Sequence, residues 1–288
     1  METRIRRGIA ATVALAATTA AVVVGLGGNS SAADAAGLRA YGITATGRQL
    51  LTFTTDDPTV NDWVRNVTGL STDTALIGID FRVQDGLLYG VGNYGGVYTI
   101  SIPGAALKKV SQLSVPLHGS MFGVDFNPAA NRLRVISDTG QNLRHNIDDG
   151  AGAGITTVDK PLTNSPSTAT ATGVTAAAYT NNDLNVDTGT TLFDLNTVSD
   201  QVVIQSPAND GLLVPTGRLG PDAGPNAGLD IFSKLTNGKT TALSAFAVLM
   251  LTDGSATFHT VDLLTGAATP VGELPLPVGD IAVALDGS

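Results

Sequence analysis

The sequence predicts an all-β fold, a β-propeller of about five four-stranded blades. A phrase of Gly, an aliphatic residue, Asp and then Phe or Ile recurs along the chain, and its copies begin at Gly78, Gly123 and Gly228. A copy with Thr in place of Asp begins at Gly173, and a looser copy begins at Gly279. A repeat of about 50 residues that is rich in β-forming runs is typical of propeller blades.

Each copy is followed by the same order of short strands and turns. In the first unit, β-forming runs at 87–91, 97–100 and 108–113 are separated by glycine-rich and Pro-Gly turns. Together with the phrase itself, these three runs make four short strands, the pattern of an antiparallel meander. We expect residues 142–147, 192–195 and 257–263 to be the third strands of later units.

The two ends of the folded chain are expected to share one blade. Residues 38–43 match the second strand of the other units, and residues 280–285 match a first strand. Pairing of these segments closes the ring and removes exposed sheet edges. A sixth blade is an alternative if residues 207–225 contain a degenerate unit. A β-sandwich is a second alternative, but it does not explain the regular period.

Residues 1–36 have the pattern of a secretory signal peptide. Arg4, Arg6 and Arg7 precede a stretch without charge from Gly8 to Ala33, and small residues follow. An uncleaved membrane anchor is the alternative. We therefore expect a protein that is secreted or located in the cell envelope, with a single propeller domain at 37–288 and no other membrane segment.

The lack of cysteine and the negative net charge limit the chemistry and the binding partners that this chain can have. The chain contains no cysteine, so disulfides and thiol catalysis are excluded. Its formal net charge of −9 opposes binding to nucleic acid and to anionic membranes. We expect a monomer whose partner is an extracellular ligand, either a glycan or a protein.

The repeated carboxylates have two interpretations. If the phrase forms the innermost strand, Asp80, Asp125, Asp230 and Asp280 surround the central channel. In the structural interpretation, each carboxylate accepts backbone N–H bonds from the adjacent blade, and Thr175 suits this role because its side chain also carries an oxygen acceptor. In the functional interpretation, the carboxylates converge on the channel and hold a cation or a substrate.

A second group of oxygen ligands resembles a calcium loop. Asp183, Asn185, Asp187 and Asp194 occupy positions 1, 3, 5 and 12 of such a loop. Thr188 stands where the loop needs Gly, and position 12 is Asp rather than Glu. Calcium is the one cofactor that the sequence suggests, and a polar surface loop is the alternative.

The sequence predicts no catalytic residues. It lacks the Gly-x-Ser-x-Gly elbow of a serine nucleophile and the glycine-rich loop of a phosphate site. His118, His145 and His259 have no spacing that brings two zinc ligands together.

One region resembles a known family. Residues 122–128 read Phe-Gly-Val-Asp-Phe-Asn-Pro, and residues 137–144 read Ser-Asp-Thr-Gly-Gln-Asn-Leu-Arg. With residues 178–182 and 207–211, these runs resemble a family of secreted bacterial proteins classed as a domain of unknown function. The resemblance covers nearly all of the mature chain. It implies an exported, propeller-like domain and no catalytic assignment.

Within that region, the polar run at 138–144 is the candidate ligand site, and its candidate residues are Asp138, Gln141, Asn142 and Arg144. Arg132, Arg134 and Arg144 are expected to face one another across the hairpin, where they either meet an anion or pair with neighbouring carboxylates.

Two functions remain. The first is a non-enzymatic module that binds a ligand or a protein, favoured by the propeller pattern, the acidic composition and the missing catalytic motifs. The alternative is a metal-assisted hydrolase or lactonase that uses carboxylates at the central channel. That alternative rests on the recurring Asp and on analogy with other propellers.

Overall fold

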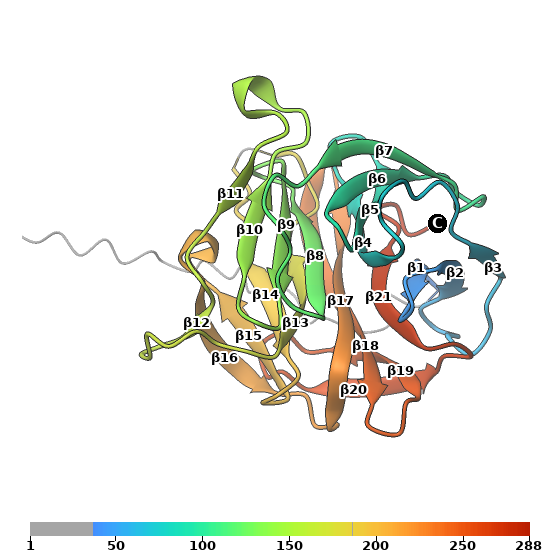
Figure 1. Cartoon of the computed structure of the whole chain (residues 1–288). Coiled ribbons are helices and arrows are strands. Elements are labelled where there is room, and N and C mark those ends of the chain that lie inside the picture. Colours follow the sequence, from blue (N-terminus) through green and yellow to red (C-terminus); the bar gives the residue numbers. More distant parts are fainter. Residues whose placement is uncertain (1–36, 186) are drawn as a thin grey trace, which may run out of the picture.

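Five sheets surround a central axis in the computed structural model, which describes residues 37–185 and 187–288 (Figure 1). The predicted signal peptide, residues 1–36, lies outside the described residues. The inner strands of neighbouring sheets contact one another in the order β4, β8, β13, β17, β21 and back to β4. The predicted all-β propeller with five blades is therefore confirmed.

Blades 1 to 4 follow the chain. Blade 1 contains β4 (Leu76–Arg82), β5 (Leu87–Gly92), β6 (Gly96–Ile100) and β7 (Leu107–Gln112). Blade 2 contains β8 (Phe122–Asn127), β9 (Arg132–Ser137), β10 (Asn142–His145) and β11 (Thr156–Val158). Blade 3 contains β13 (Val174–Tyr179), β14 (Leu192–Asn196), β15 (Gln201–Gln205) and β16 (Leu212–Arg218), and β12 (Thr163–Asn164) pairs in parallel with β16. Blade 4 contains β17 (Ala223–Thr236), β18 (Lys239–Leu251), β19 (Ala256–Val261) and β20 (Ala268–Glu273).

Blade 5 joins the two ends of the chain, as predicted. It contains β21 (Val278–Val283), β1 (Arg39–Thr44), β2 (Gln49–Thr54) and β3 (Trp63–Asn66). β21 pairs with β1 in antiparallel fashion, with Ala40 opposite Val283 and Gly42 opposite Ile281. This pairing makes β21 the inner strand of the blade and β1 its second strand.

Two details differ from the expectations. Residues 207–225 contain the short 3-10 helix η3 (Ala208–Asp210), β16 and the start of β17, so they form no sixth blade. Residues 192–195 lie in β14, the second strand of blade 3 rather than the third. The reason is that no strand is formed between β13 and β14 among the described residues there, and the connection is a long loop.

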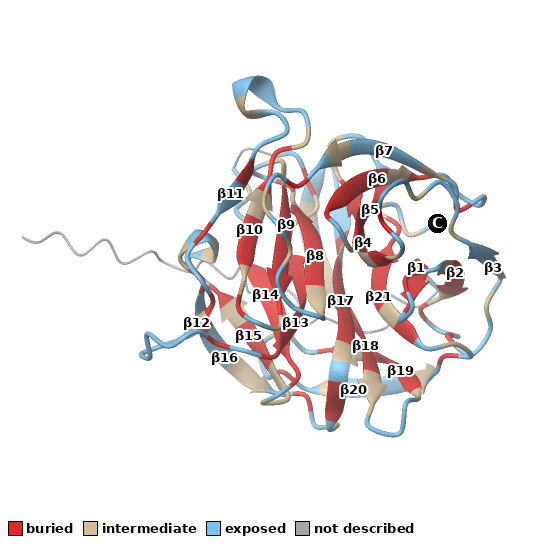
Figure 2. Ribbon diagram, in the orientation of Figure 1, coloured by how far each residue is buried: buried red, intermediate tan, exposed pale blue. Residues whose placement is uncertain are grey.

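The core is divided among the five interfaces between neighbouring blades, where Figure 2 shows the strands largely buried. Phe53 of blade 5 and Phe258 of blade 4 meet edge to face, with ring centroids 5.1 Å apart. Tyr89 of blade 1 and Phe126 of blade 2 make a similar contact at 5.1 Å. Since the chain has no disulfide, these apolar interfaces supply most of the stabilisation of the ring.

The glycine of the repeated phrase is required by the close approach of the inner strands. A Cβ atom on Gly123 would lie 2.6 Å from the Ala177 backbone nitrogen, and one on Gly78 would lie 2.5 Å from Val124 Cγ2. A Cβ atom on Gly228 would lie 2.6 Å from the Cα atom of Asp280. Real Cβ atoms essentially never make contacts this short, so any larger residue requires a shift of the neighbouring atoms, which at Gly123 and Gly228 belong to the backbone.

Candidate functional site

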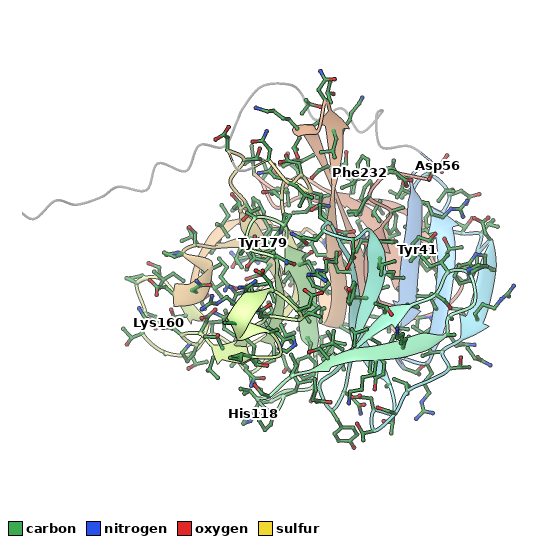
Figure 3. The ribbon with its side chains drawn as sticks, turned by 90° about the horizontal axis from the view of Figure 1, so that it is seen from above. Tyr41, Asp56, His118, Lys160, Tyr179 and Phe232 are labelled. Atoms are coloured by element: carbon green, nitrogen blue, oxygen red, sulfur yellow. The ribbon has the colours of Figure 1, made fainter. Side chains whose placement is uncertain are left out.

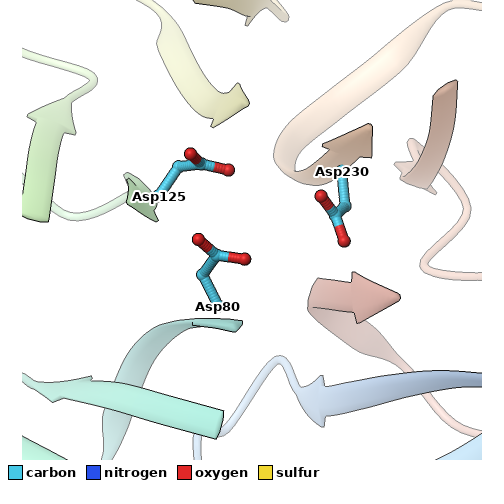
Figure 4. Close-up of side chains that lie close together, drawn as sticks. All are labelled: Asp80, Asp125 and Asp230. Atoms are coloured by element: carbon cyan, nitrogen blue, oxygen red, sulfur yellow. The ribbon is translucent and has the colours of Figure 1, made fainter. Parts of the chain in front are cut away.

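Three carboxylates of the repeated phrase meet at the axis of the ring (Figure 4). Asp80 lies on β4, Asp125 on β8 and Asp230 on β17, and all three are buried. One carboxylate oxygen from each lies within 4.8 Å of the others. The three inner strands that carry the phrase thus bring these side chains to one point.

Each of these carboxylates also accepts a hydrogen bond from the backbone of the next inner strand. Asp80 Oδ2 accepts from the Phe126 N–H at 2.7 Å, and Asp125 Oδ1 accepts from the Tyr179 N–H at 3.2 Å. Asp230 Oδ2 accepts from the Val283 N–H. These bonds are the ones that the structural interpretation of the repeated Asp requires, and they link blade 1 to 2, 2 to 3 and 4 to 5.

The remaining two inner strands lack the carboxylate at this position. The donors Tyr179 and Val283 directly follow Ala178 and Ala282, just as Phe126 follows Asp125. Ala178 and Ala282 therefore occupy the place of the repeated Asp. The alignment of Thr175 with that Asp is therefore wrong by three residues, since the N–H that Asp125 accepts belongs to Tyr179.

Asp280 approaches the axis from a different position. It lies two residues before Ala282, and its Oδ2 accepts from the Ile79 N–H of blade 1 at 2.8 Å. Its bond links blade 5 to blade 1. Together, the four carboxylates link four of the five neighbouring pairs of blades. Blades 3 and 4 are linked by other carboxylates, since Asp200 accepts from the Ala223 N–H and Asp183 from the Thr240 N–H.

Burial and mutual repulsion govern the ionisation of this group. Burial raises the pKa of Asp80 and of Asp125 well above the usual range, and repulsion from neighbouring carboxylates raises both further. Burial also raises the pKa of Asp280 well above that range, and the pKa of Asp230 to about 6. The group therefore favours protons or a cation over three or four bare charges.

Asp80, Asp125 and Asp230 are the residues that fit a metal ion. Their oxygens are hard ligands, and a mutual separation within 4.8 Å is compatible with ligands around one calcium ion. Among the described residues, no other group of three acidic or histidine side chains meets this criterion.

The residues of the calcium-like loop are not gathered in this way. Asp183 Oδ1 accepts from the Asn185 N–H, and its Oδ2 accepts from the backbone N–H and the hydroxyl of Thr240 in blade 4. Asp187 is exposed, whereas Asp194 is fully buried in β14. Asp183 thus fastens the loop to the β17–β18 hairpin, and calcium binding by the loop stays a prediction.

The four candidate residues of the polar run at 138–144 do not form one site, because they contact different parts of the structure. Asp138 Oδ1 accepts from the Ser120 N–H, and Gln141 bonds the backbone of Pro116 and His118, so both hold the preceding loop. Asn142 is buried and bonds Arg134 Nη1. Arg144, the fourth candidate, lines a cleft over blade 2 together with Arg132.

The three arginines pair with carboxylates. Arg134 and Arg144 both bond Asp159 Oδ2 at 2.7 Å, and Arg132 bonds Asp149 Oδ2 at 3.0 Å. Of the two alternatives for these side chains, pairing with neighbouring acids is the one that the structure shows. Sequence reasoning missed Asp159 because it lies 15 residues beyond Arg144.

The histidines occupy structural positions. His145 is buried between the Ser111 and Thr156 hydroxyls, and burial lowers its pKa to about 4. His259 is buried and bonds the Thr257 carbonyl. His118 lies at the edge of the molecule, far from the interior position of Tyr179 (Figure 3).

Comparison with known proteins identifies the family. The model of the family described as "Domain of unknown function (DUF4394)" matches residues 49–282. The chain belongs to this family. No functionally curated protein matches it significantly.

Several solved structures are similar to this chain at low sequence identity. They include a chain of the nidogen/laminin complex (10% identity, 86% of this chain and 98% of that chain, TM-score 0.49). An auxiliary nutrient binding protein from Bacteroides ovatus is similar at 11% identity (80% and 58%, TM-score 0.41). Kuenenia stuttgartiensis hydrazine synthase is similar at 12% identity (70% and 51%, TM-score 0.38), so this chain spans about half of its length.

Proposed function

We propose that this DUF4394 chain is a secreted, non-enzymatic binding module. The observation that carries the proposal is the engagement of the axial carboxylates, the strongest candidates for chemistry, with backbone N–H groups of neighbouring blades. A group that holds the ring together is poorly placed to exchange protons with a substrate. The propeller then serves as a rigid scaffold whose loops and outer strands contact the ligand.

The test is a screen of glycans, cell-wall fragments and secreted proteins against the purified full chain. Calorimetry reports binding, and mass spectrometry reports the chemical state of each ligand after incubation with calcium, magnesium or zinc. We expect at least one ligand to bind and to be recovered unchanged. Turnover of a bound ligand contradicts the proposal.

The proposal of secretion rests on residues 1–36 and on the acidic, cysteine-free composition. Among the described residues, no helix is long and apolar enough to cross a membrane. Expression of the full chain in a bacterium, followed by N-terminal sequencing of the protein in the medium, is expected to show cleavage near Ala33 or Ala35. An intact N-terminus on a membrane-bound product supports the anchor instead.

A metal-assisted hydrolase or lactonase is the second candidate, favoured by the convergence of Asp80, Asp125 and Asp230 within 4.8 Å. In that case, elemental analysis of the purified protein shows about one divalent ion per chain, and Asp125→Asn abolishes both the ion and the hydrolysis of simple lactones. Absence of lactone hydrolysis with metal supplied rejects this candidate.

A further inference from the structure

A cleft of about 210 Å³ lies over the outer strands of blade 2. Its floor is formed by side chains of β9, β10 and β11, and its wall by the loop between β10 and β11, which projects from the sheet (Figure 1). This loop contains the short 3-10 helix η2 (Gly150–Gly152). The lining residues are Arg132, Arg144, Asn146, Gly152, Ile155 and Thr157.

Strand register brings the three arginines of blade 2 to one face. Arg134 of β9 lies directly opposite Arg144 of β10, which lies opposite Thr157 of β11. Arg132 lies two residues before Arg134 in β9, so its side chain projects from the same face. Like charges directly opposite one another repel, so this face needs anionic partners.

The three guanidinium groups differ in how many of their nitrogens donate hydrogen bonds within the protein. Arg134 is buried and donates to Tyr179, Asn142, Asp159 and Asn209 through all three of its nitrogens. Within the described chain, Arg144 donates only through Nε, at 2.7 Å to Asp159. Arg132, likewise among the residues that the structure describes, donates only through Nη1. A guanidinium group carries five N–H donors, so Arg132 and Arg144 both bring unused donors to the cleft.

The three arginines of blade 2 also outnumber the carboxylates with which they form ion pairs. The three guanidinium groups share two carboxylates, those of Asp149 and Asp159. Both oxygens of the nearby Asp148 accept from Arg82 instead. The Arg132–Asp149 pair is partly exposed, and exposed pairs contribute little energy, so a ligand carboxylate can compete with Asp149.

We propose that this cleft binds the carboxylate of a small organic acid of about monosaccharide size, such as a uronic acid. The volume lies below the roughly 300–1,000 Å³ that is usual for pockets of drug-sized ligands, so a smaller ligand is expected. Two guanidinium forks match a carboxylate in geometry and charge. Ile155, 55% exposed at the cleft, offers an apolar contact that an inorganic anion cannot use. This inference rests on the proposed function, because it assigns a ligand class to a binding module.

The test is calorimetric titration of the full chain with galacturonate, with galactose and inorganic phosphate as comparison ligands. We expect galacturonate to bind, galactose to show no binding, and phosphate to bind at least tenfold more weakly than galacturonate. Equal binding of galactose, or phosphate binding as tight as galacturonate, overturns the proposed ligand class.

Variants then locate the site. Arg132→Gln and Arg144→Gln are each expected to weaken galacturonate binding about tenfold or more, since each removes charge-assisted hydrogen bonds. Arg218→Gln on β16 is the matched control, because Arg218 is exposed and lies outside the cleft. Thermal melting confirms that each variant is folded. Unchanged affinity in folded Arg132→Gln and Arg144→Gln overturns the assignment.

Different results reject the ligand site in the cleft and the non-enzymatic function. If galacturonate binding is independent of both arginines, the cleft is excluded while the binding module stands. If galacturonate binds through the arginines and is chemically converted, the cleft stands and the non-enzymatic function is wrong. Binding through the arginines with recovery of unchanged ligand supports both.

Discussion

Replacing Asp80 by Ala is expected to lower the free energy of unfolding by about 2–6 kcal/mol. The Asp80 carboxylate accepts from the Phe81 N–H at 2.6 Å and from the Phe126 N–H at 2.7 Å, and both donors are buried. Each buried donor left without a partner costs about 1–3 kcal/mol. The loss is a large part of the roughly 5–15 kcal/mol that stabilises an ordinary domain.

The assay is urea unfolding at pH 5, followed by the fluorescence of Trp63, the single tryptophan of the chain. Burial raises the pKa of Asp80 and of Asp125, so an acidic pH favours their neutral forms and reduces the repulsion that would otherwise mask the loss of the hydrogen bonds. Asp80→Asn retains one acceptor oxygen and is expected to lose about half as much. Asp222→Ala, an exposed control, is expected to change stability by less than about 0.5 kcal/mol.

Two results refute this reasoning. If Asp80→Ala unfolds at the same urea concentration as the wild type, the axial hydrogen bonds do not stabilise the ring. If Asp80→Ala is more stable than the wild type even at pH 5, the carboxylate is retained at a cost to stability, as expected of a group kept for binding or catalysis.

Further predictions concern the same axis. Gly123→Ala is expected to lower the melting temperature by several degrees, because the added Cβ would lie 2.6 Å from the Ala177 nitrogen. Gly189→Ala is the control, because no neighbouring atom lies within 4 Å of a Cβ placed there. Equal melting temperatures of the two variants contradict this expectation. The pKa of Asp230 is raised to about 6, so its stabilising contribution is complete below the unfolded pKa near 4 and is lost as the pH rises through 6. Wild type should therefore lose stability relative to Asp230→Asn between pH 4 and 8 in thermal melts, and a gain has the wrong sign. Calcium is expected to raise the melting temperature at pH 8 more than at pH 4 if the axial carboxylates bind it, and an equal shift at both pH values argues against that site.

The period of the repeated phrase predicted about five blades, because three of the inner strands, β4, β8 and β17, need a glycine where they approach the next inner strand. Gly78, Gly123 and Gly228 all meet neighbouring atoms at less than 3 Å from a Cβ position. Where the inner strand is built differently, the phrase misleads. In β13, Ala178 rather than Thr175 takes the place of Asp, since the N–H that donates to Asp125 belongs to Tyr179, the residue after Ala178.

The sites were less predictable than the fold. The sequence places Arg132, Arg134 and Arg144 on one hairpin, but the choice between an anion and internal partners depends on Asp159, which reaches them through tertiary packing. The cleft depends on the conformation of the loop at 146–155, which has no regular pattern. Likewise, Asp183 and Asp194 are close in sequence, yet one fastens a loop to blade 4 and the other is buried in a strand without a hydrogen-bond partner in the described structure.

Amide hydrogen exchange in Asp80→Ala tests the central claim most directly, namely that each axial carboxylate holds the next inner strand. The account predicts faster exchange at Phe126, whose N–H loses its acceptor, while Tyr179 and Val283, bonded to Asp125 and Asp230, keep their protection. Unchanged protection at Phe126 in the folded variant contradicts the account.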